Sequence, residues 1–159
     1  MPDYPQVHIW TDGGCRPSNP GPGGYGVVLR YNDQRKELSG GFRHTTNNRM
    51  ELLAAIVGLE SLNRPCRVTL HSDSKYLVDA INLGWARRWQ ANGWKRNKQG
   101  DKALNPDLWQ RLLDLIAQHR VEFVWVRGHS GVADNERCDA LARQAAQADN
   151  LPVDEGMSV

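Results

Sequence analysis

The sequence predicts an α/β fold in which one mixed β-sheet carries helices on its faces. Three stretches near the start are typical of β-strands, and helical and strand-like segments alternate afterwards, giving the order β-β-β-α-β-α-α-β-α. Consecutive strands favour antiparallel pairing, whereas strands separated by helices favour parallel pairing through right-handed crossovers. We therefore expect a five-stranded mixed sheet, with three antiparallel strands and two added in parallel, flanked by helices.

The first three strands are indicated by apolar runs and one short turn. The first covers 7–10 and ends at Asp12, and the next two cover 25–31 and 36–43, joined by a turn. Residues 11–26 contain six of the fifteen glycines and three of the eight prolines. Glycine permits unusual backbone angles and proline fixes φ, so we expect this segment to follow a defined path without regular structure.

The later elements follow from helical spacing and capping signals. Met50, Leu53 and Val57 recur at the spacing of a helix, which predicts one over 48–62. The other predicted elements are a strand at 67–72, a helix from Lys75 to about Leu83, a helix at 107–118 opened by Asn105-Pro106, a strand at 121–126 and a helix from about 134 to 148. We expect one domain over 1–148 and a disordered acidic tail over 149–159.

Composition narrows the class of protein further. A chain of 159 residues suits one domain, and its three cysteines, Cys15, Cys66 and Cys138, are far apart and form no CxxC pair. Neither a disulfide framework nor a structural zinc site is indicated. The N-terminus lacks the features of a signal peptide, and no run approaches the roughly 18 apolar residues of a membrane span. We therefore expect a cytoplasmic protein without a membrane partner.

A tryptophan-rich basic segment interrupts an otherwise balanced chain. The net charge is only +2, yet the stretch from Trp85 to Lys102 contains six basic residues and one acid. Cationic side chains that neutralise phosphates, with aromatic faces nearby, are typical of nucleic-acid grooves. Two alternatives stay open, because Trp85 and Trp89 can anchor a protruding helix and the cations can form a solvated face.

Four carboxylates stand at the ends of predicted elements: Asp12, Glu51, Asp73 and Asp139. In an α/β sheet, sites form beyond the carboxyl ends of the parallel strands, so Asp12 and Asp73 should lie close together. Two adjacent carboxylates repel unless a cation lies between them. A hard, oxygen-ligating cation such as Mg²⁺ would resolve the repulsion.

Each acid also has a structural interpretation. Glu51 completes a capping-box pattern with Asn48, and Asp73 can cap the following helix. Asp139 can pair with Arg143 one helical turn later. Asp12 can be an ordinary turn residue. The joint placement of the four acids favours a site over these separate explanations.

The motifs, taken together, resemble bacterial type 1 ribonuclease H from Val7 to Ala148. They are TDG followed by NPGPGG, TTNNRMEL, a DS pair after a strand, the tryptophan-rich segment, DLWQRL, and GH followed by NERCDALA. The resemblance implies a ribonuclease H-like fold and an endonuclease that hydrolyses the RNA strand of an RNA/DNA hybrid. It implies 3′-hydroxyl and 5′-phosphate products, two Mg²⁺ ions with Mn²⁺ as a possible substitute, and a monomer.

The resemblance also assigns residue roles. The metal-ligand positions fall on Asp12, Glu51, Asp73 and Asp139, and the mobile histidine that aids proton transfer or product release falls on His129. Substrate contacts fall on Asn19, Asn47 and Asn48 for the backbone and 2′-hydroxyls, on Thr46 and Trp89 for a DNA phosphate, on Trp85, Arg87, Arg88 and Trp94 in a basic protrusion or handle, and on Asn135.

Two other functions are compatible with parts of this pattern. A nuclease of the same general fold could act on DNA, although the handle and the asparagine positions argue against it. A hybrid-binding module could use the acids only for structure, although all four acids and His129 are present. Cleavage of a DNA duplex as fast as a hybrid would favour the first alternative, and binding without turnover would favour the second.

Overall fold

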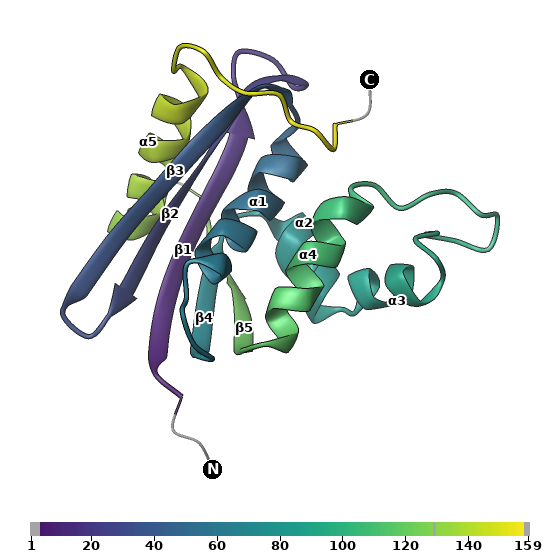
Figure 1. Ribbon diagram of the computed structural model, residues 1–159, viewed down its shortest axis with the longest axis horizontal. Helices are drawn as coiled ribbons and strands as arrows, with labels where there is room; N and C mark the ends of the chain where they lie inside the picture. Colours follow the sequence, from purple (N-terminus) through teal and green to yellow (C-terminus); the bar gives the residue numbers. More distant parts are fainter. Residues whose placement is uncertain (1–3, 129, 158–159) are drawn as a thin grey trace.

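One mixed sheet with helices on both faces forms the framework of the protein (Figure 1). The computed structural model describes residues 4–128 and 130–157. Its elements are β1 (Gln6–Cys15), β2 (Gly21–Tyr31), β3 (Gln34–Thr45), α1 (Asn47–Glu60), β4 (Arg67–Ser72), α2 (Lys75–Asn82), α3 (Trp85–Ala91), α4 (Pro106–Ala117), β5 (Arg120–Trp125) and α5 (Ala133–Ala146). The strand order is β3-β2-β1-β4-β5, with the first three antiparallel and the last two added in parallel. The predicted fold class is confirmed.

Strand β1 is longer than the sequence indicated, and this places Asp12 within it. Its parallel ladder with β4 ends at the pair Thr11–Ser72, whereas its antiparallel ladder with β2 continues to Cys15. Asp12 therefore lies one residue beyond the parallel ladder while its backbone stays fixed by β2. The predicted site at the carboxyl edge of β1 and β4 is preserved, although Asp12 does not end its strand.

The glycine-rich segment is also more regular than expected, because much of it belongs to β1 and β2. Gly24 and Gly26 lie directly under α5, and a Cβ at Gly24 would approach the backbone N of Ala146 to 2.8 Å. The glycines thus let α5 pack closely on a strand. The expectation of a path without regular structure holds only for residues 16–20.

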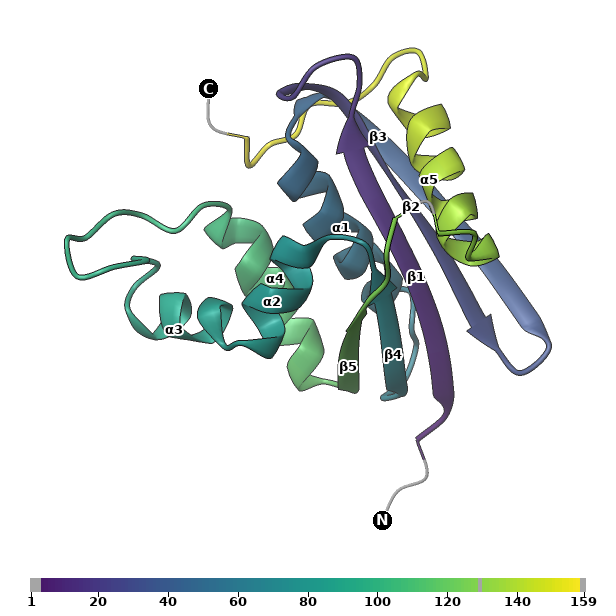
Figure 2. The same ribbon diagram turned by 180° about the vertical axis from the view of Figure 1, so that it is seen from behind.

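The two faces of the sheet are covered differently (Figure 2). Helix α5 packs over β2 and neighbouring strands on one face, while α1, α2 and α4 cover the other. The main core lies on the second side, where Ile9, Leu70 and Trp109 are fully buried. No helix of the described residues is both long and apolar enough to cross a membrane.

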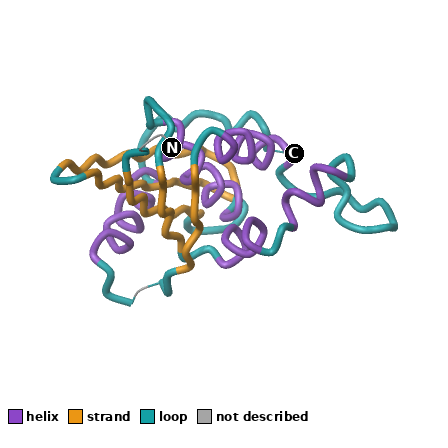
Figure 3. The backbone as a smooth tube through the Cα atoms, turned by 90° about the horizontal axis from the view of Figure 1, so that it is seen from below, coloured by secondary structure: helices purple, strands orange, loops and turns teal. Residues whose placement is uncertain are grey.

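Three helices, not the expected two, lie between β4 and β5. Gly84, with φ of 78°, adopts the left-handed conformation that glycine allows and separates α2 from the extra helix α3. Helix α3 and the loop after it project from the body, as seen from below in Figure 3. Trp89 anchors this projection by packing edge-to-face on Trp109, with ring centroids 5.9 Å apart.

The C-terminal segment departs from the predicted disordered tail. After α5 the chain crosses the end of the sheet toward α1 (Figure 1), and Arg43 N donates a hydrogen bond of 3.0 Å to Pro152 O. The Asp154 carboxylate accepts from Thr45 at 2.7 Å and from Arg49 at 2.7 Å. The buried guanidinium of Arg49 on α1 thus fixes the C-terminal segment, whose sequence has no helical or strand periodicity.

Candidate active site

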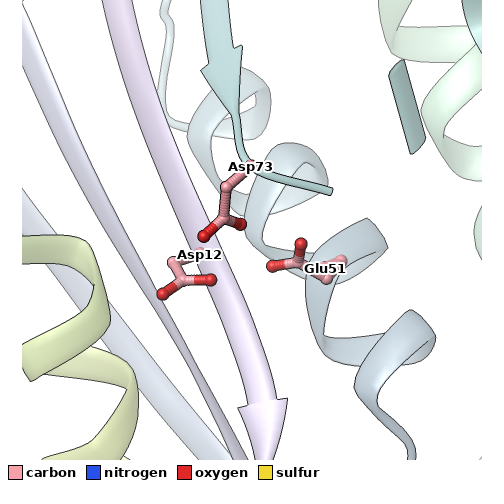
Figure 4. Close-up of side chains that lie close together, drawn as sticks. All are labelled: Asp12, Glu51 and Asp73. Atoms are coloured by element: carbon pink, nitrogen blue, oxygen red, sulfur yellow. The ribbon is translucent and has the colours of Figure 1, made fainter. Parts of the chain in front are cut away.

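Three carboxylates from separate elements converge at the carboxyl edge of β1 and β4 (Figure 4). Asp12 comes from β1, Glu51 from α1, and Asp73 from the residue after β4. One oxygen of each lies within 4.8 Å of the others. They line a cleft of about 520 Å³, into which Asp139, Asn47 and Asn48 also face. The predicted proximity of Asp12 and Asp73 is observed, and Glu51 joins them.

Glycine at position 13 allows this convergence. A Cβ there would collide with the backbone of Met50 and approach the backbone N of Glu51 to 2.7 Å. Helix α1 therefore meets β1 backbone to backbone, immediately beside the residue that carries the Asp12 carboxylate. The Gly13 N–H also donates to Asp12 Oδ1 at 2.9 Å, which orients that side chain.

Gly13→Ala is expected to separate β1 from α1 and to lower both stability and activity. Overpacking of this kind costs about 1–3 kcal/mol, measurable by urea denaturation. Gly14→Ala is the matched control, because its Cβ would meet only the Asn47 side chain at an ordinary 3.5 Å. Equal stability losses in the two variants would contradict the proposed close approach.

The structural interpretations of Glu51 and Asp73 do not hold. Thr46 is the N-cap of α1 and accepts a hydrogen bond from Arg49 N at 3.2 Å, so Glu51 does not belong to a capping box with Asn48. Ser74 is the N-cap of α2. Asp73 therefore has no capping role there, and both carboxylates are directed into the cleft.

The electrostatics of the three acids indicate a site built for a cation. Burial, together with the negative charge of Asp73, raises the pKa of Asp12 to about 7. Burial likewise raises the pKa of Glu51 well above its ordinary value, with Asp12 adding to the effect, and burial raises the pKa of Asp73. Among the described residues, buried Glu51 Oε1 has no hydrogen-bond partner. An all-oxygen donor set with an unpaired buried oxygen fits a hard divalent cation.

Asp139 lies at the rim of the cleft and outside the close group. Its Oδ2 pairs with Arg143 Nη2 at 3.0 Å, the helical pairing that the sequence left open. The negative charge of Asp139 still acts on the three acids, since it raises the pKa of both Asp12 and Asp73. A rotation of the side chain away from Arg143 would be needed for direct ligation.

Asparagines join the glycine-rich loop to the start of α1. Asn19 Oδ1 accepts from Asn47 N at 3.0 Å, and Asn47 Oδ1 accepts from Cys15 N at 2.8 Å. These bonds place Asn47 and Asn48 against the acid group, on the wall of the same cleft. Asn47 and Asn48 thus lie beside the carboxylates, and Asn19 is joined to them through its bond with Asn47 N.

The handle forms a separate basic and aromatic surface. Trp85, Arg88 and Trp89 line a pocket of about 430 Å³ together with Asn92 and Arg96. Arg87 is exposed on the same helix. Trp85, Trp89 and Trp94 also pack against the core. The anchoring interpretation of the tryptophans and the presence of an accessible cationic surface are therefore compatible.

Asn135 stands apart from this arrangement. Asn135 is only 2% exposed, near the start of α5, and so is not presented to the cleft surface. His129 lies outside the described residues. Gly128, the residue before it in the chain, lies against the acid group, because a Cβ there would be 3.1 Å from Asp73 Oδ2.

Trp125 is a candidate that the sequence analysis did not single out. It is 47% exposed, and its indole N–H donates to the backbone O of Asp73 at 3.3 Å. The Lys75 ammonium lies 5.7 Å from the ring centroid. A tryptophan at the last position of β5, beside the edge where the acids gather, is the signal that could have identified it.

Comparisons with known proteins show what the chain as a whole is similar to. The RNase H family model matches residues 4–147. A ribonuclease H of Syntrophus aciditrophicus is 65% identical over 151 residues, which cover 95% of this chain and 86% of that protein. The crystal structure of LC9-RNase H1, a type 1 RNase H with the type 2 active-site motif, superimposes with a TM-score of 0.82 at 33% identity, covering 92% of this chain and 74% of that one. LC11-RNase H1 in complex with an RNA/DNA hybrid gives 0.66 at 25% identity, covering 88% and 96%.

Proposed function

The chain belongs to the ribonuclease H family, whose members cleave RNA in RNA/DNA hybrids, and we propose that it hydrolyses the RNA strand with two divalent metal ions. The products of this proposed endonuclease are a 5′-phosphate and a 3′-hydroxyl. The observation that supports the chemistry most directly is the group of three buried carboxylates within 4.8 Å, set in an open cleft. Such a group is costly without a cation and well suited to one.

Asp12, Glu51 and Asp73 would hold Mg²⁺, or Mn²⁺ in its place. When bound, the ions would lower the pKa of the attacking water and stabilise charge on the leaving 3′-oxygen. Glu51 is fixed by burial and Asp12 by its bond from Gly13 N, so these two side chains would define the geometry. Asp139 would turn toward the group from Arg143, and His129 would move a proton or assist product release.

Substrate recognition is proposed for the wall of the cleft and for the handle. Asn19, Asn47 and Asn48 would contact the RNA backbone and the 2′-hydroxyls, which distinguish RNA from DNA in the wide minor groove of the hybrid. Thr46 and Trp89 would grip a phosphate of the DNA strand. Exposed Trp125 extends this surface beside Asp73 and offers an aromatic face to the nucleic acid.

Matched duplexes test this function. End-labelled RNA/DNA hybrid, RNA duplex and DNA duplex of one sequence are incubated with the protein and Mg²⁺, and the product ends are mapped. We expect cleavage only in the RNA strand of the hybrid, with phosphate on the 5′ ends. DNA duplex cleavage at the hybrid rate would instead identify a DNA nuclease, and hybrid binding without turnover would identify a binding module.

Replacing both Arg87 and Arg88 with alanine should weaken hybrid binding and reduce its salt dependence. Each lost phosphate contact lowers the slope of log K against log salt by about 0.9 for B-form DNA. The control replaces Arg64 and Arg67 with alanine. These exposed arginines lie near the start of β4, at the end opposite to the acids. A slope that is the same in the handle variant and the wild type would show that α3 only supports the fold.

The monomeric state, the cytoplasmic location and the single domain over 1–148 stay predictions.

A further inference from the structure

Two histidines meet on the face of the sheet opposite the main core. His8 on β1 and His71 on β4 are hydrogen-bonded through their ring nitrogens, with Nδ1 of His8 lying 3.2 Å from Nε2 of His71. In the parallel register His8 pairs with Thr69 and Trp10 with His71, so the histidines are diagonal neighbours. They come from segments 63 positions apart and lie on adjacent strands.

Trp10 restricts the orientation of both rings. It stacks on His71 with ring centroids 4.5 Å apart and an interplanar angle of 7°, and on His8 at 5.7 Å. All three side chains are half-buried. The two nitrogens are therefore held on a stacked support, and Trp10 itself packs against Cys138 and Leu141 of α5.

The separation of the nitrogens matches that of two ligands on one metal ion. Zinc–nitrogen distances of about 2.0–2.1 Å and a tetrahedral angle place two imidazole nitrogens about 3.3 Å apart. We propose that His8 Nδ1 and His71 Nε2 chelate a divalent late transition-metal ion of the Zn²⁺ class. Each ring would keep its proton on its other nitrogen and direct a lone pair at the ion.

Glu122 adds a negative charge near the pair, although its carboxylate does not lie within 4.8 Å of both histidine nitrogens. Glu122 lies on β5 and pairs with Thr69, two residues before His71 on β4. Its side chain is exposed on the same face of the sheet as the histidines. Its negative charge reaches the His71 ring. Two imidazoles with a carboxylate charge nearby suit zinc, with the other coordination positions left for solvent.

This proposed site differs in chemistry from the carboxylate group and does not rest on the proposed nuclease function. Imidazole favours Zn²⁺, Ni²⁺ and Cu²⁺, whereas the oxygen-only group of Asp12, Glu51 and Asp73 favours Mg²⁺. An ion on His8 and His71 would tie β1 to β4, the two strands that position Asp12 and Asp73. It would stabilise the folded state by mass action.

Calorimetric titration with Zn²⁺ tests the proposal on the full chain. The Asp12→Asn variant is the starting protein, because it weakens competing binding at the carboxylate group. We expect saturable binding of one Zn²⁺ and a rise in the thermal midpoint. Adding His8→Gln, or separately His71→Gln, should weaken the affinity at least tenfold, about 1.4 kcal/mol.

His44→Gln, in the same background, is the matched control, since His44 is exposed on β3 and away from the pair. Its Zn²⁺ affinity should equal that of the starting protein. Equal affinities in the His8→Gln and His44→Gln proteins would overturn the proposal, as would the absence of saturable binding. Either result would leave His8 and His71 as a hydrogen-bonded pair without affinity for metal.

Discussion

Asp12→Asn is expected to abolish hydrolysis and, at the same time, to make the metal-free protein more stable. The loss should be about 10³-fold or more, because a metal ligand contributes several kcal/mol to the transition state and each 1.36 kcal/mol is a factor of ten. Steady-state cleavage of the hybrid at saturating Mg²⁺ measures it. Near-normal turnover would refute the role of Asp12 as a ligand.

The stability gain follows from the raised pKa of Asp12, which lies at about 7 in the folded chain against an ordinary 3.8. A carboxyl with a raised pKa favours the folded state while protonated, so wild-type stability falls as the pH rises from about 4 to about 7. Asparagine carries no charge to repel its neighbours. We expect the variant to gain about 2–4 kcal/mol near pH 8 and little at about pH 4.

Urea denaturation at the two pH values measures this gain, and Mg²⁺ provides the internal control. A bound cation relieves the repulsion between the carboxylates only in the wild type. Added Mg²⁺ should therefore narrow the difference in unfolding free energy between the two proteins. A variant that is less stable than the wild type at pH 8 without metal would contradict the account of the carboxylate group.

Arg49→Met is expected to cause the largest loss of stability, about 3–5 kcal/mol. Arg49 is only 3% exposed on α1 and pairs with Asp107 of α4 and Asp154 of the C-terminal segment, each at 2.7 Å. Removing the guanidinium leaves buried Asp154 with Thr45 as its one remaining side-chain donor among the residues that the structure describes. Burial opposes ionisation of Asp154, but the bonds from Arg49 and Thr45 outweigh it and lower the pKa.

The contribution of Arg49 to the free energy of unfolding should therefore be present above about pH 4. It should disappear as the pH falls further, because its carboxylate partners have lowered pKa values and stabilise the fold only while ionised. Arg111→Met is the matched control, because Arg111 and Glu60 join the same two helices through a half-exposed pair. That pair should contribute about 1 kcal/mol or less. Equal losses in the two variants would show that burial of Arg49 has no special importance.

The sequence was sufficient to predict the sheet and the meeting of its acids, because both follow from local patterns. The antiparallel and parallel pairing followed from which strands are adjacent and which are separated by helices, and the common carboxyl edge of parallel strands then placed Asp12 near Asp73. Glu51 was singled out with the other acids, and the family motifs assigned it a metal-ligand position; its approach depends on a contact between Gly13 and α1 that only the folded chain reveals.

Features set by tertiary packing could not be predicted in the same way. Gly24 looked like a loop residue and Gly26 like part of a strand, yet both allow α5 to lie on β2. Asp154 looked like part of a disordered tail, because its partners Thr45 and Arg49 lie more than 100 positions earlier. Trp125 and the His8–His71 pair likewise acquire their neighbours only when separate strands come together.

The central claim is that Asp12, Glu51 and Asp73 hold the metal on which hydrolysis depends. The most direct measurement is cleavage of a labelled RNA/DNA hybrid as a function of Mg²⁺ concentration, for the wild type and for Glu51→Gln, with hybrid binding measured in parallel. We predict that a chelator stops wild-type cleavage, that Mg²⁺ restores it, and that Glu51→Gln binds the hybrid but cleaves about 10³-fold more slowly. Cleavage that persists in the chelator, or in Glu51→Gln at the wild-type rate, would contradict the claim.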